Sequence, residues 1–85
     1  MKDKHNILGV HITDRLEEAV EVQRYLTEYG RFIRTRLGLH DVAVDSPNGL
    51  LLLELVGLDE KVAELSGKLN ALEGVETQLI VFEHE

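Results

Sequence analysis

Two histidines and two arginines are the residues of this chain with the clearest potential for ligand chemistry. His11 falls near the end of an apolar stretch, and His40 follows an alternating stretch that contains Arg34 and Arg36. A guanidinium is a planar donor that can bind a carboxylate or phosphate through two hydrogen bonds. An imidazole can ligate a metal or exchange a proton near neutral pH. We therefore take Arg36 and His40, followed by Arg34 and His11, as candidate ligand contacts.

Each of these residues also has a purely structural explanation. Arg34 and Arg36 could keep an edge strand soluble and unpaired, or could pair with Glu54 across a sheet. The histidines show neither His-x-His spacing nor the i, i+4 spacing of helical metal ligands, and the chain has no cysteine. We expect no metal site within one chain. Interface histidines His11 and His40 from several subunits remain the alternative.

The chain has no arrangement of residues that is typical of an enzyme. It contains no nucleophile–base pair and no glycine-rich phosphate loop opening a helix. Its clustered glutamates, Glu17, Glu18 and Glu21, fit the solvated face of a helix whose N-terminus also favours acidic residues. We therefore expect a non-enzymatic protein with no cofactor.

Composition excludes several classes of partner. Sixteen acidic residues against nine basic ones give a net charge of −7, which disfavours direct contact with a nucleic-acid backbone. The longest fully apolar run, residues 50–53, is far shorter than the roughly 20 residues that a membrane span needs. No long apolar segment follows the N-terminal residues as in a signal peptide. These features predict a cytoplasmic protein that binds neither nucleic acid nor membrane.

The chain repeats one order of elements. An apolar strand, an amphipathic helix, a glycine and an alternating strand occur twice, with strands expected at residues 6–12, 31–37, 50–56 and 75–82. Two such halves predict a single domain over residues 1–85 with an α+β, ferredoxin-like βαββαβ fold. Its four-stranded antiparallel sheet would carry two helices on one face. The most apolar strand, residues 50–53, favours a central position, and the charged second strand favours an edge.

Both helices have start and stop signals. Asp14 with Glu17 has the spacing of a capping box, and Asp59 is expected to begin the second helix, which runs to about Leu72. Gly30 and Gly74 are expected to end the helices with positive φ. The predicted inner face of the first helix comprises Leu16, Ala19, Val20, Gln23, Leu26 and Tyr29. That of the second comprises Val62, Leu65, Leu69 and Leu72.

The stretch between the second and third strands is less clear. Ser46-Pro47-Asn48-Gly49 is typical of a turn. Val42-Ala43-Val44 could extend a long hairpin or belong to a loop. Residues 39–48 therefore receive no predicted conformation.

The sheet face opposite the helices is expected to be unusually apolar. The period of two places on the helix side Leu8, Val10, Ile12, Leu51, Leu53, Leu55, Leu79 and Val81. It places on the open face Ile7, Gly9, Phe32, Leu50, Leu52, Ile80 and Phe82, mixed with His11, Arg34, Arg36, Glu54 and Gln78. A patch of this extent is usually covered by a partner. We expect a homodimer or homotetramer whose interface contains Phe32, Leu50, Leu52, Ile80 and Phe82.

Two motifs resemble those of a known family. The first is Glu28-Tyr29-Gly30-Arg31-Phe32-Ile33 followed by Arg36-Leu37-Gly38-Leu39. The second is Leu65-Ser66-Gly67-Lys68-Leu69-Asn70-Ala71-Leu72-Glu73-Gly74-Val75. This combination is similar to that of the iron-only hydrogenase system regulators, and the likeness runs from Ile7 to about Val81. The resemblance implies an ACT-like fold, similar to the regulatory domain of nickel-responsive repressors.

The resemblance also implies a regulatory module connected with iron-only hydrogenase expression or maturation. The nickel-responsive repressors carry a His-x-His pair on their second strand, where this chain has Arg34 and Arg36, and they also carry a cysteine and a DNA-binding segment that this chain lacks. We therefore expect an oligomeric regulator that binds a small ligand or a partner protein at an inter-subunit interface. A metal-binding sensor or carrier using interface histidines is the alternative.

Overall fold

The computed structural model describes residues 3–13, 15–40, 49–57 and 59–84, and it confirms the predicted fold class. The elements are β1 (Asp3–Ile12), α1 (Arg15–Glu28), the 3₁₀ turn η1 (Gly30–Phe32), β2 (Ile33–His40), β3 (Gly49–Leu55), α2 (Asp59–Asn70) and β4 (Val75–His84). All strand pairs are antiparallel in the order β2-β3-β1-β4, so the first and third strands are central, as predicted. The expected cap at Asp14 and the stretch 41–48 lie outside the described residues.

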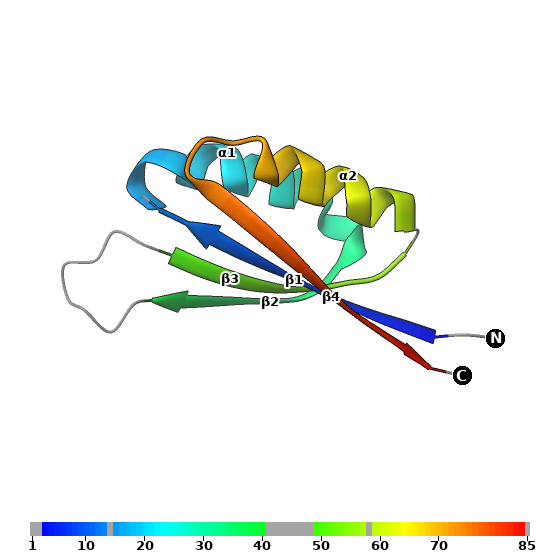
Figure 1. Ribbon diagram of the computed structural model, residues 1–85. Coiled ribbons are helices and arrows are strands. Elements are labelled where there is room, and N and C mark those ends of the chain that lie inside the picture. Colours follow the sequence, from blue (N-terminus) through cyan, green and yellow to red (C-terminus); the bar gives the residue numbers. More distant parts are fainter. Residues whose placement is uncertain (1–2, 14, 41–48, 58, 85) are drawn as a thin grey trace.

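The core lies between the sheet and its two helices, which cover the same face (Figure 1). Its fully buried side chains alternate along the central strands, as the period of two requires. They are Leu8 and Val10 on β1, Leu53 and Leu55 on β3, Val22 on α1, and Leu65 and Leu69 on α2. Burial of these aliphatic groups is the main favourable contribution to folding.

The inner face of α1 differs from the prediction. Val22, Leu26 and Tyr29 are buried, whereas Val20 is 73% exposed and Gln23 is also exposed. Positions 22, 26 and 29 follow the helical spacing of three and four residues, but Val20 lies on the outer side of the same helix. The predicted face was therefore wrong at Val20 and Gln23.

The inner face of α2 and its terminating glycine agree with the prediction. Val62, Leu65 and Leu69 are buried, and Leu72 packs against them from the turn that follows. Gly74 has a φ of 80° and leads into β4. Gly30 does not take a positive φ, because the chain continues from α1 into the 3₁₀ turn instead of ending at a glycine cap. The predicted role of Gly30 was wrong.

A bulge near its start changes which way β2 faces. Ile33 pairs with Leu55, but Thr35 pairs with Glu54, so Arg34 is an extra residue without a partner on β3. One inserted residue sends the following side chains to the opposite face of the sheet. As a result Leu37 and Leu39 lie opposite Leu52 and Leu50 on the open face, and Arg36 lies on the helix side.

The pairing of β1 with β4 extends beyond the helices. The two strands match in an unbroken register of ten pairs, from Asp3 opposite His84 to Ile12 opposite Val75. Figure 1 shows both chain ends leaving the body along this two-stranded ribbon. Leu79 and Val81 face the helix side, as predicted, yet they are 43% and 44% exposed.

Candidate functional site

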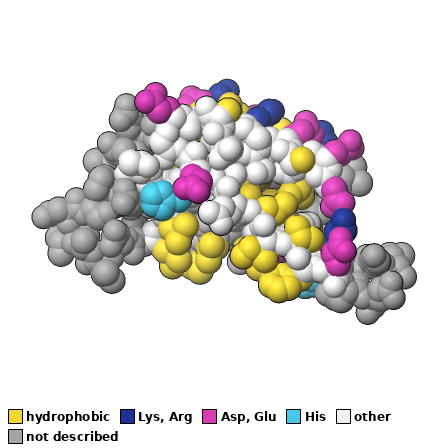
Figure 2. Space-filling view, in the orientation of Figure 1, with side chains coloured by type: hydrophobic (Ala, Val, Ile, Leu, Met, Phe, Trp, Pro, Cys, Tyr) yellow, Lys and Arg dark blue, Asp and Glu magenta, His cyan; other side chains and the backbone are white. Residues whose placement is uncertain are grey.

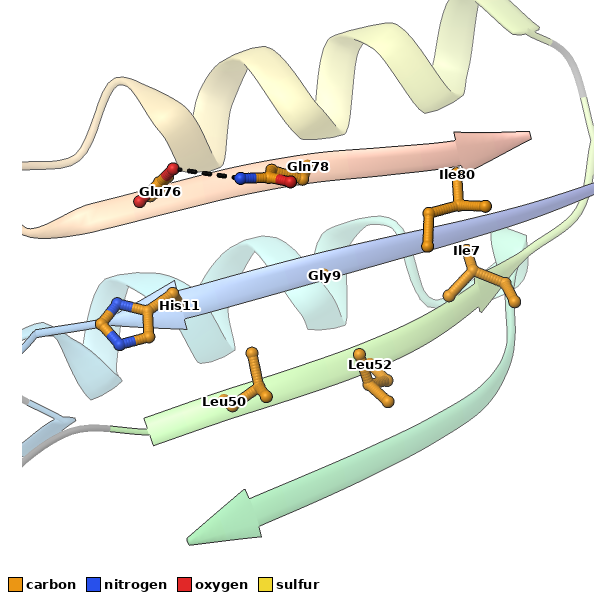
Figure 3. Close-up of a pocket in the computed structure, with 8 residues that line it drawn as sticks. All are labelled: Ile7, Gly9, His11, Leu50, Leu52, Glu76, Gln78 and Ile80. Carbon is orange, nitrogen blue, oxygen red and sulfur yellow. Dashed lines mark hydrogen bonds between the residues drawn. The ribbon is translucent and has the colours of Figure 1, made fainter. Parts of the chain in front are cut away.

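The open face of the sheet carries a hollow of about 380 Å³ in its middle. Three neighbouring strands line it, with β1 between β3 and β4 (Figure 3). The lining residues are Ile7, Gly9 and His11 of β1, Leu50 and Leu52 of β3, and Glu76, Gln78 and Ile80 of β4. The hollow is therefore built by the tertiary register of the sheet and not by one contiguous motif.

Gly9 deepens the hollow because it has no side chain to occupy it. It sits on the central strand between Leu52 and Gln78. A Cβ atom added there would be 3.7 Å from the Gln78 carbonyl oxygen and 3.9 Å from Leu52 Cδ2, both ordinary contacts. A side chain would therefore fit at position 9 without steric conflict. Its absence leaves room for another molecule.

The hollow has one apolar end and one polar end. Ile7 and Ile80 lie side by side at the apolar end, and His11 lies opposite Glu76 at the other (Figure 3). The Gln78 amide Nε2 donates to Glu76 Oε2 at 3.3 Å. None of the lining residues is Lys or Arg. This chemistry suits a small molecule with an apolar body and a head group that both donates and accepts hydrogen bonds.

The bulge removes Arg36 from the face on which it was expected. Arg36 Nη2 donates to Gln23 Oε1 of α1 at 2.8 Å, on the helix side of the sheet. Glu54 accepts a 3.0 Å hydrogen bond from Thr35 and lies 3.9 Å from His5 Nδ1, so its contacts differ from the predicted arginine pairing. Arg34 is exposed at the bulge. The predicted open-face position of Arg36 was wrong.

Of the candidate ligand contacts whose side chains the structure describes, His11 alone lines the hollow. His40 ends β2 opposite Gly49, and strand β3 separates it from β1, which carries His11. The side chain of His40 lies outside the described part of the structure. Within that part, no group of three or more His, Cys, Asp or Glu residues could hold a metal ion.

Most of the predicted interface residues lie around the hollow. Leu50, Ile80 and Phe82 are 36%, 52% and 54% exposed, and Leu52 is half-buried. Phe32 is the exception, because it belongs to η1 and packs against the core beside Gly57. Its predicted position on the open face was wrong. Leu37 and Leu39, which the sequence reasoning missed, take part in this face instead.

The family-like motifs meet on the other side of the molecule. A second, shallower hollow between the end of α1, η1 and α2 is lined by Glu28, Tyr29, Arg31, Phe32, Lys61, Glu64 and Lys68. Lys68 Nζ lies 5.0 Å from the centre of the Tyr29 ring and 3.3 Å from Glu28 Oε1. These contacts join the two helices and bring together two motifs that are far apart in the sequence.

The lysines whose pKa is raised lie outside the hollow of the open face. A hydrogen bond to Asp59, at 2.7 Å, and the charge of Asp59 hold the pKa of Lys4 above its ordinary value of 10.5. The pKa of Lys68 is raised mainly by a hydrogen bond to Tyr29, and that of Lys61 by Glu64. The Lys4–Asp59 pair connects α2 to β1, and the contacts of Lys68 connect α2 to the end of α1, whereas Lys61 and Glu64 both belong to α2. Figure 2 shows the charged side chains along the helical layer and hydrophobic ones gathered over the strands.

Comparison with known proteins identifies the fold alone. No protein-family model and no curated protein matches the chain. The uncharacterized protein TM1266 of Thermotoga maritima superposes with a TM-score of 0.83 at 23% identity, over 94% of this chain and 99% of that one. No described helix is long and apolar enough to cross a membrane.

Two further solved structures share the fold. The nitrogen regulatory PII-like protein CPII of Thiomonas intermedia has a TM-score of 0.66 at 8% identity, over 99% of this chain and 95% of that one. Another structure of it is described as bound to ADP, AMP and bicarbonate. A formyltetrahydrofolate deformylase of Pseudomonas putida matches at TM-score 0.59 and 22% identity, over 89% of this chain but only 28% of that one. Regulatory proteins and part of an enzyme therefore share this architecture.

Proposed function

We propose that this chain is a non-catalytic regulatory module that binds a small ligand in the hollow of its open sheet face. The observation that carries the proposal is the hollow around Gly9, with an apolar end at Ile7 and Ile80 and a polar end at His11 and Glu76. A concave, mostly apolar surface with a few converging polar groups is the usual form of a small-molecule site.

The described fold neighbours support a regulatory role more than a catalytic one. CPII is a nitrogen regulatory PII-like protein, and one of its structures holds nucleotides and bicarbonate. The hollow of this chain differs in chemistry from a nucleotide site, because none of the described residues that line it is a Lys or Arg that could face a phosphate. We therefore propose an amphipathic ligand of low charge.

Self-association completes the proposed module. Exposed leucines from β2 and β3 and the apolar residues of β4 surround the hollow, and a second copy would enclose it. A ligand held between copies would favour the assembled state by its differential affinity for that state. Substituting Leu52 with Lys should therefore weaken both assembly and ligand binding.

We propose that this module regulates the iron-only hydrogenase system. The support is the resemblance of Tyr29-Gly30-Arg31 and Arg36-Leu37-Gly38 to that family's motifs. Deleting the gene in a host with such a hydrogenase should change hydrogenase activity, and restoring it should reverse the change. Unchanged hydrogenase activity and transcript levels would separate the module from this process.

Filling the floor of the hollow tests the ligand proposal. Thermal unfolding of the wild type and of Gly9→Val should be measured with a panel of amino acids, short carboxylic acids, adenine nucleotides, and divalent nickel, zinc and iron. A compound that raises the wild-type melting temperature should no longer do so for Gly9→Val, because the valine side chain occupies its space. The variant should itself fold, since a Cβ fits there.

Gly67→Ala is the matched control. Gly67 lies on the exposed side of α2 with nothing within 4 Å of an added Cβ, so the variant should respond to the ligand like the wild type. Equal responses of the wild type and Gly9→Val would contradict the hollow as the site. A response to the metals alone, lost in His11→Ala, would favour the metal-binding alternative.

A further inference from the structure

The outer edge of β4 presents four consecutive large hydrophobic side chains to solvent. Leu79, Ile80, Val81 and Phe82 are 43%, 52%, 44% and 54% exposed. Two of them face the helix side and two the open face, so neither layer of the molecule covers this segment. Figure 1 shows β4 at the edge of the sheet and diverging from the helical layer toward its C-terminal end. A long, flat, apolar edge strand is a surface for pairing with another strand.

The backbone of this edge is available as well. The Thr77 N–H points away from β1, because it donates to Asn70 Oδ1 at 3.2 Å. Successive residues of a strand turn their N–H and C=O groups alternately to the two sides. The main-chain groups of Leu79, Val81 and Glu83 therefore also point outward. Unlike the Thr77 N–H, these outward groups make no hydrogen bond within the described part of the chain, so a further strand could pair with them.

We propose that β4 pairs antiparallel with β4 of a second copy of this chain, around a two-fold axis at Ile80. This proposal does not depend on the ligand hollow. The two sheets would join into one continuous sheet with all helices on the same side. The resulting pairs are Ile80 with Ile80, Leu79 with Val81, Gln78 with Phe82, Thr77 with Glu83, and Glu76 with His84.

The residue types along β4 favour this register over the two registers in which the axis is shifted by one residue. Centring the axis at Val81 would place Leu79 opposite the charged Glu83. Centring it at Leu79 would place the charged Glu76 opposite Phe82. The Ile80 register instead pairs Ile80 with Ile80 and Leu79 with Val81, and it leaves only the uncharged Gln78 opposite Phe82. A two-fold axis makes the interface self-complementary, as in most homodimers.

Pairs of engineered cysteines test the register directly, because the native chain has no cysteine. Leu79→Cys and Val81→Cys should be purified separately, mixed, and oxidised. In the proposed dimer, position 79 faces position 81 of the other copy with a Cα separation of about 5.5 Å, within reach of a disulfide. Identical positions are about 8 Å apart on the diagonal, which is too far.

The mixture should therefore give a crosslinked heterodimer, whereas each variant alone should stay uncrosslinked. Both side chains point to the helix side, so stacking of two open faces cannot join them. Absence of the heterodimer in the mixture, or equal crosslinking of either variant alone, would overturn the proposed pairing.

A proline at position 81 tests the same edge without cysteine. The outward N–H of Val81 makes no bond within the described part of one chain, so Val81→Pro should leave the ladder to β1 intact. In the Leu52→Lys background, which removes the open-face contact proposed above, sedimentation should show a species of twice the 9.6 kDa chain mass, and adding Val81→Pro should make it dissociate at a concentration at least tenfold higher. An unchanged dissociation constant in a folded Val81→Pro would overturn the proposal.

The outcomes also separate this proposal from the proposed function. Loss of ligand response in Gly9→Val with normal crosslinking of the mixture would leave the edge pairing standing. Normal ligand response without crosslinking would leave the hollow standing and overturn the edge pairing. A chain that sediments as a monomer and binds a different protein through β4 would also overturn pairing with a second copy.

Discussion

The two edge strands of this sheet have opposite characters. β2 carries Arg34 and Arg36, has a bulge near its start, and is held to α1 by the hydrogen bond from Arg36 to Gln23. β4 has an unbroken register with β1 and carries four consecutive exposed hydrophobic residues, at positions 79–82. Charge and a bulge discourage a second chain from pairing with an edge, and a regular apolar strand invites it.

This difference shows how a pseudo-symmetric fold can have one closed edge and one open edge. The halves of the chain supply similar elements, so the sheet itself does not favour either side. Among the described strands at the two edges, the bulge and the two arginines occur only in the first half, near the start of β2. We infer that this protein assembles through the β4 edge of its sheet and not through the β2 edge.

Gly57→Ala should produce the largest change by loosening the start of β2. Gly57, between β3 and α2, has a φ of 103°. A Cβ there would be 2.7 Å from Cδ1 of Phe32, which lies in η1 just before β2. Backbone strain and this overlap together should lower the free energy of unfolding by about 3–4 kcal/mol. Urea denaturation would measure the loss.

Gly30→Ala is the control for Gly57→Ala. Gly30 lacks a positive φ, and nothing lies within 4 Å of its added Cβ, so the variant should be as stable as the wild type or slightly more so. Equal stabilities of the two variants would contradict the role of Gly57 in holding Phe32.

Ile80→Lys and Leu37→Lys should differ in their effect on assembly. Their native side chains have almost the same exposure, 52% and 50%, and both lie on the open face at opposite edges. If β4 pairs with itself, Ile80→Lys sets two like charges against each other and should weaken the dimer about a hundredfold, or about 3 kcal/mol. Leu37→Lys should leave that dimer nearly unchanged. Analytical ultracentrifugation of both variants would measure this, and equal weakening would instead indicate stacking of open faces.

Ile33→Ala and Leu79→Ala should differ in their effect on the stability of one chain. Ile33 of β2 packs against the core, whereas Leu79 of β4 is 43% exposed. We expect losses of about 1–2 kcal/mol for Ile33→Ala and below about 1 kcal/mol for Leu79→Ala in the monomer. Denaturation should be measured at a concentration where the chain is dissociated. A larger loss for Leu79→Ala there would show that α2 covers the edge of β4.

Lys4→Met should give the smallest effect, confined to alkaline solution. Lys4 joins the β1–β4 ribbon to Asp59 at the start of α2, and this contact raises its pKa above 10.5 in the folded chain. The contribution of a raised pKa is complete below the unfolded value and is lost as the pH rises through the folded value. The wild-type melting temperature should therefore fall more steeply than that of Lys4→Met above about pH 10.5. Parallel curves would show that the ion pair adds no stability.

The tertiary structure differs from the sequence-based prediction where one extra residue changes the face of the sheet toward which the following side chains point. Alternation along residues 31–37 placed Arg36 on the open face, but the extra residue at Arg34 reverses the strand that follows. A bulge adds a single residue without altering the local alternation of polar and apolar types, so the period of two continues across it. Residue types along α1 were similarly insufficient, because Val20 and Val22 are equally apolar but lie on different sides of the helix.

By itself the sequence determined the element order, the strand positions in the sheet, the inner face of α2 and the turn at Gly74. These features follow from local periodicity and from the conformational freedom of one glycine, so they can be read within short windows. Only the tertiary structure decided the hollow around Gly9, the contact of Arg36 with Gln23, and the exposure of both sides of β4. These depend on the register of strands far apart in the chain and on where the helical layer ends, and no local pattern encodes either.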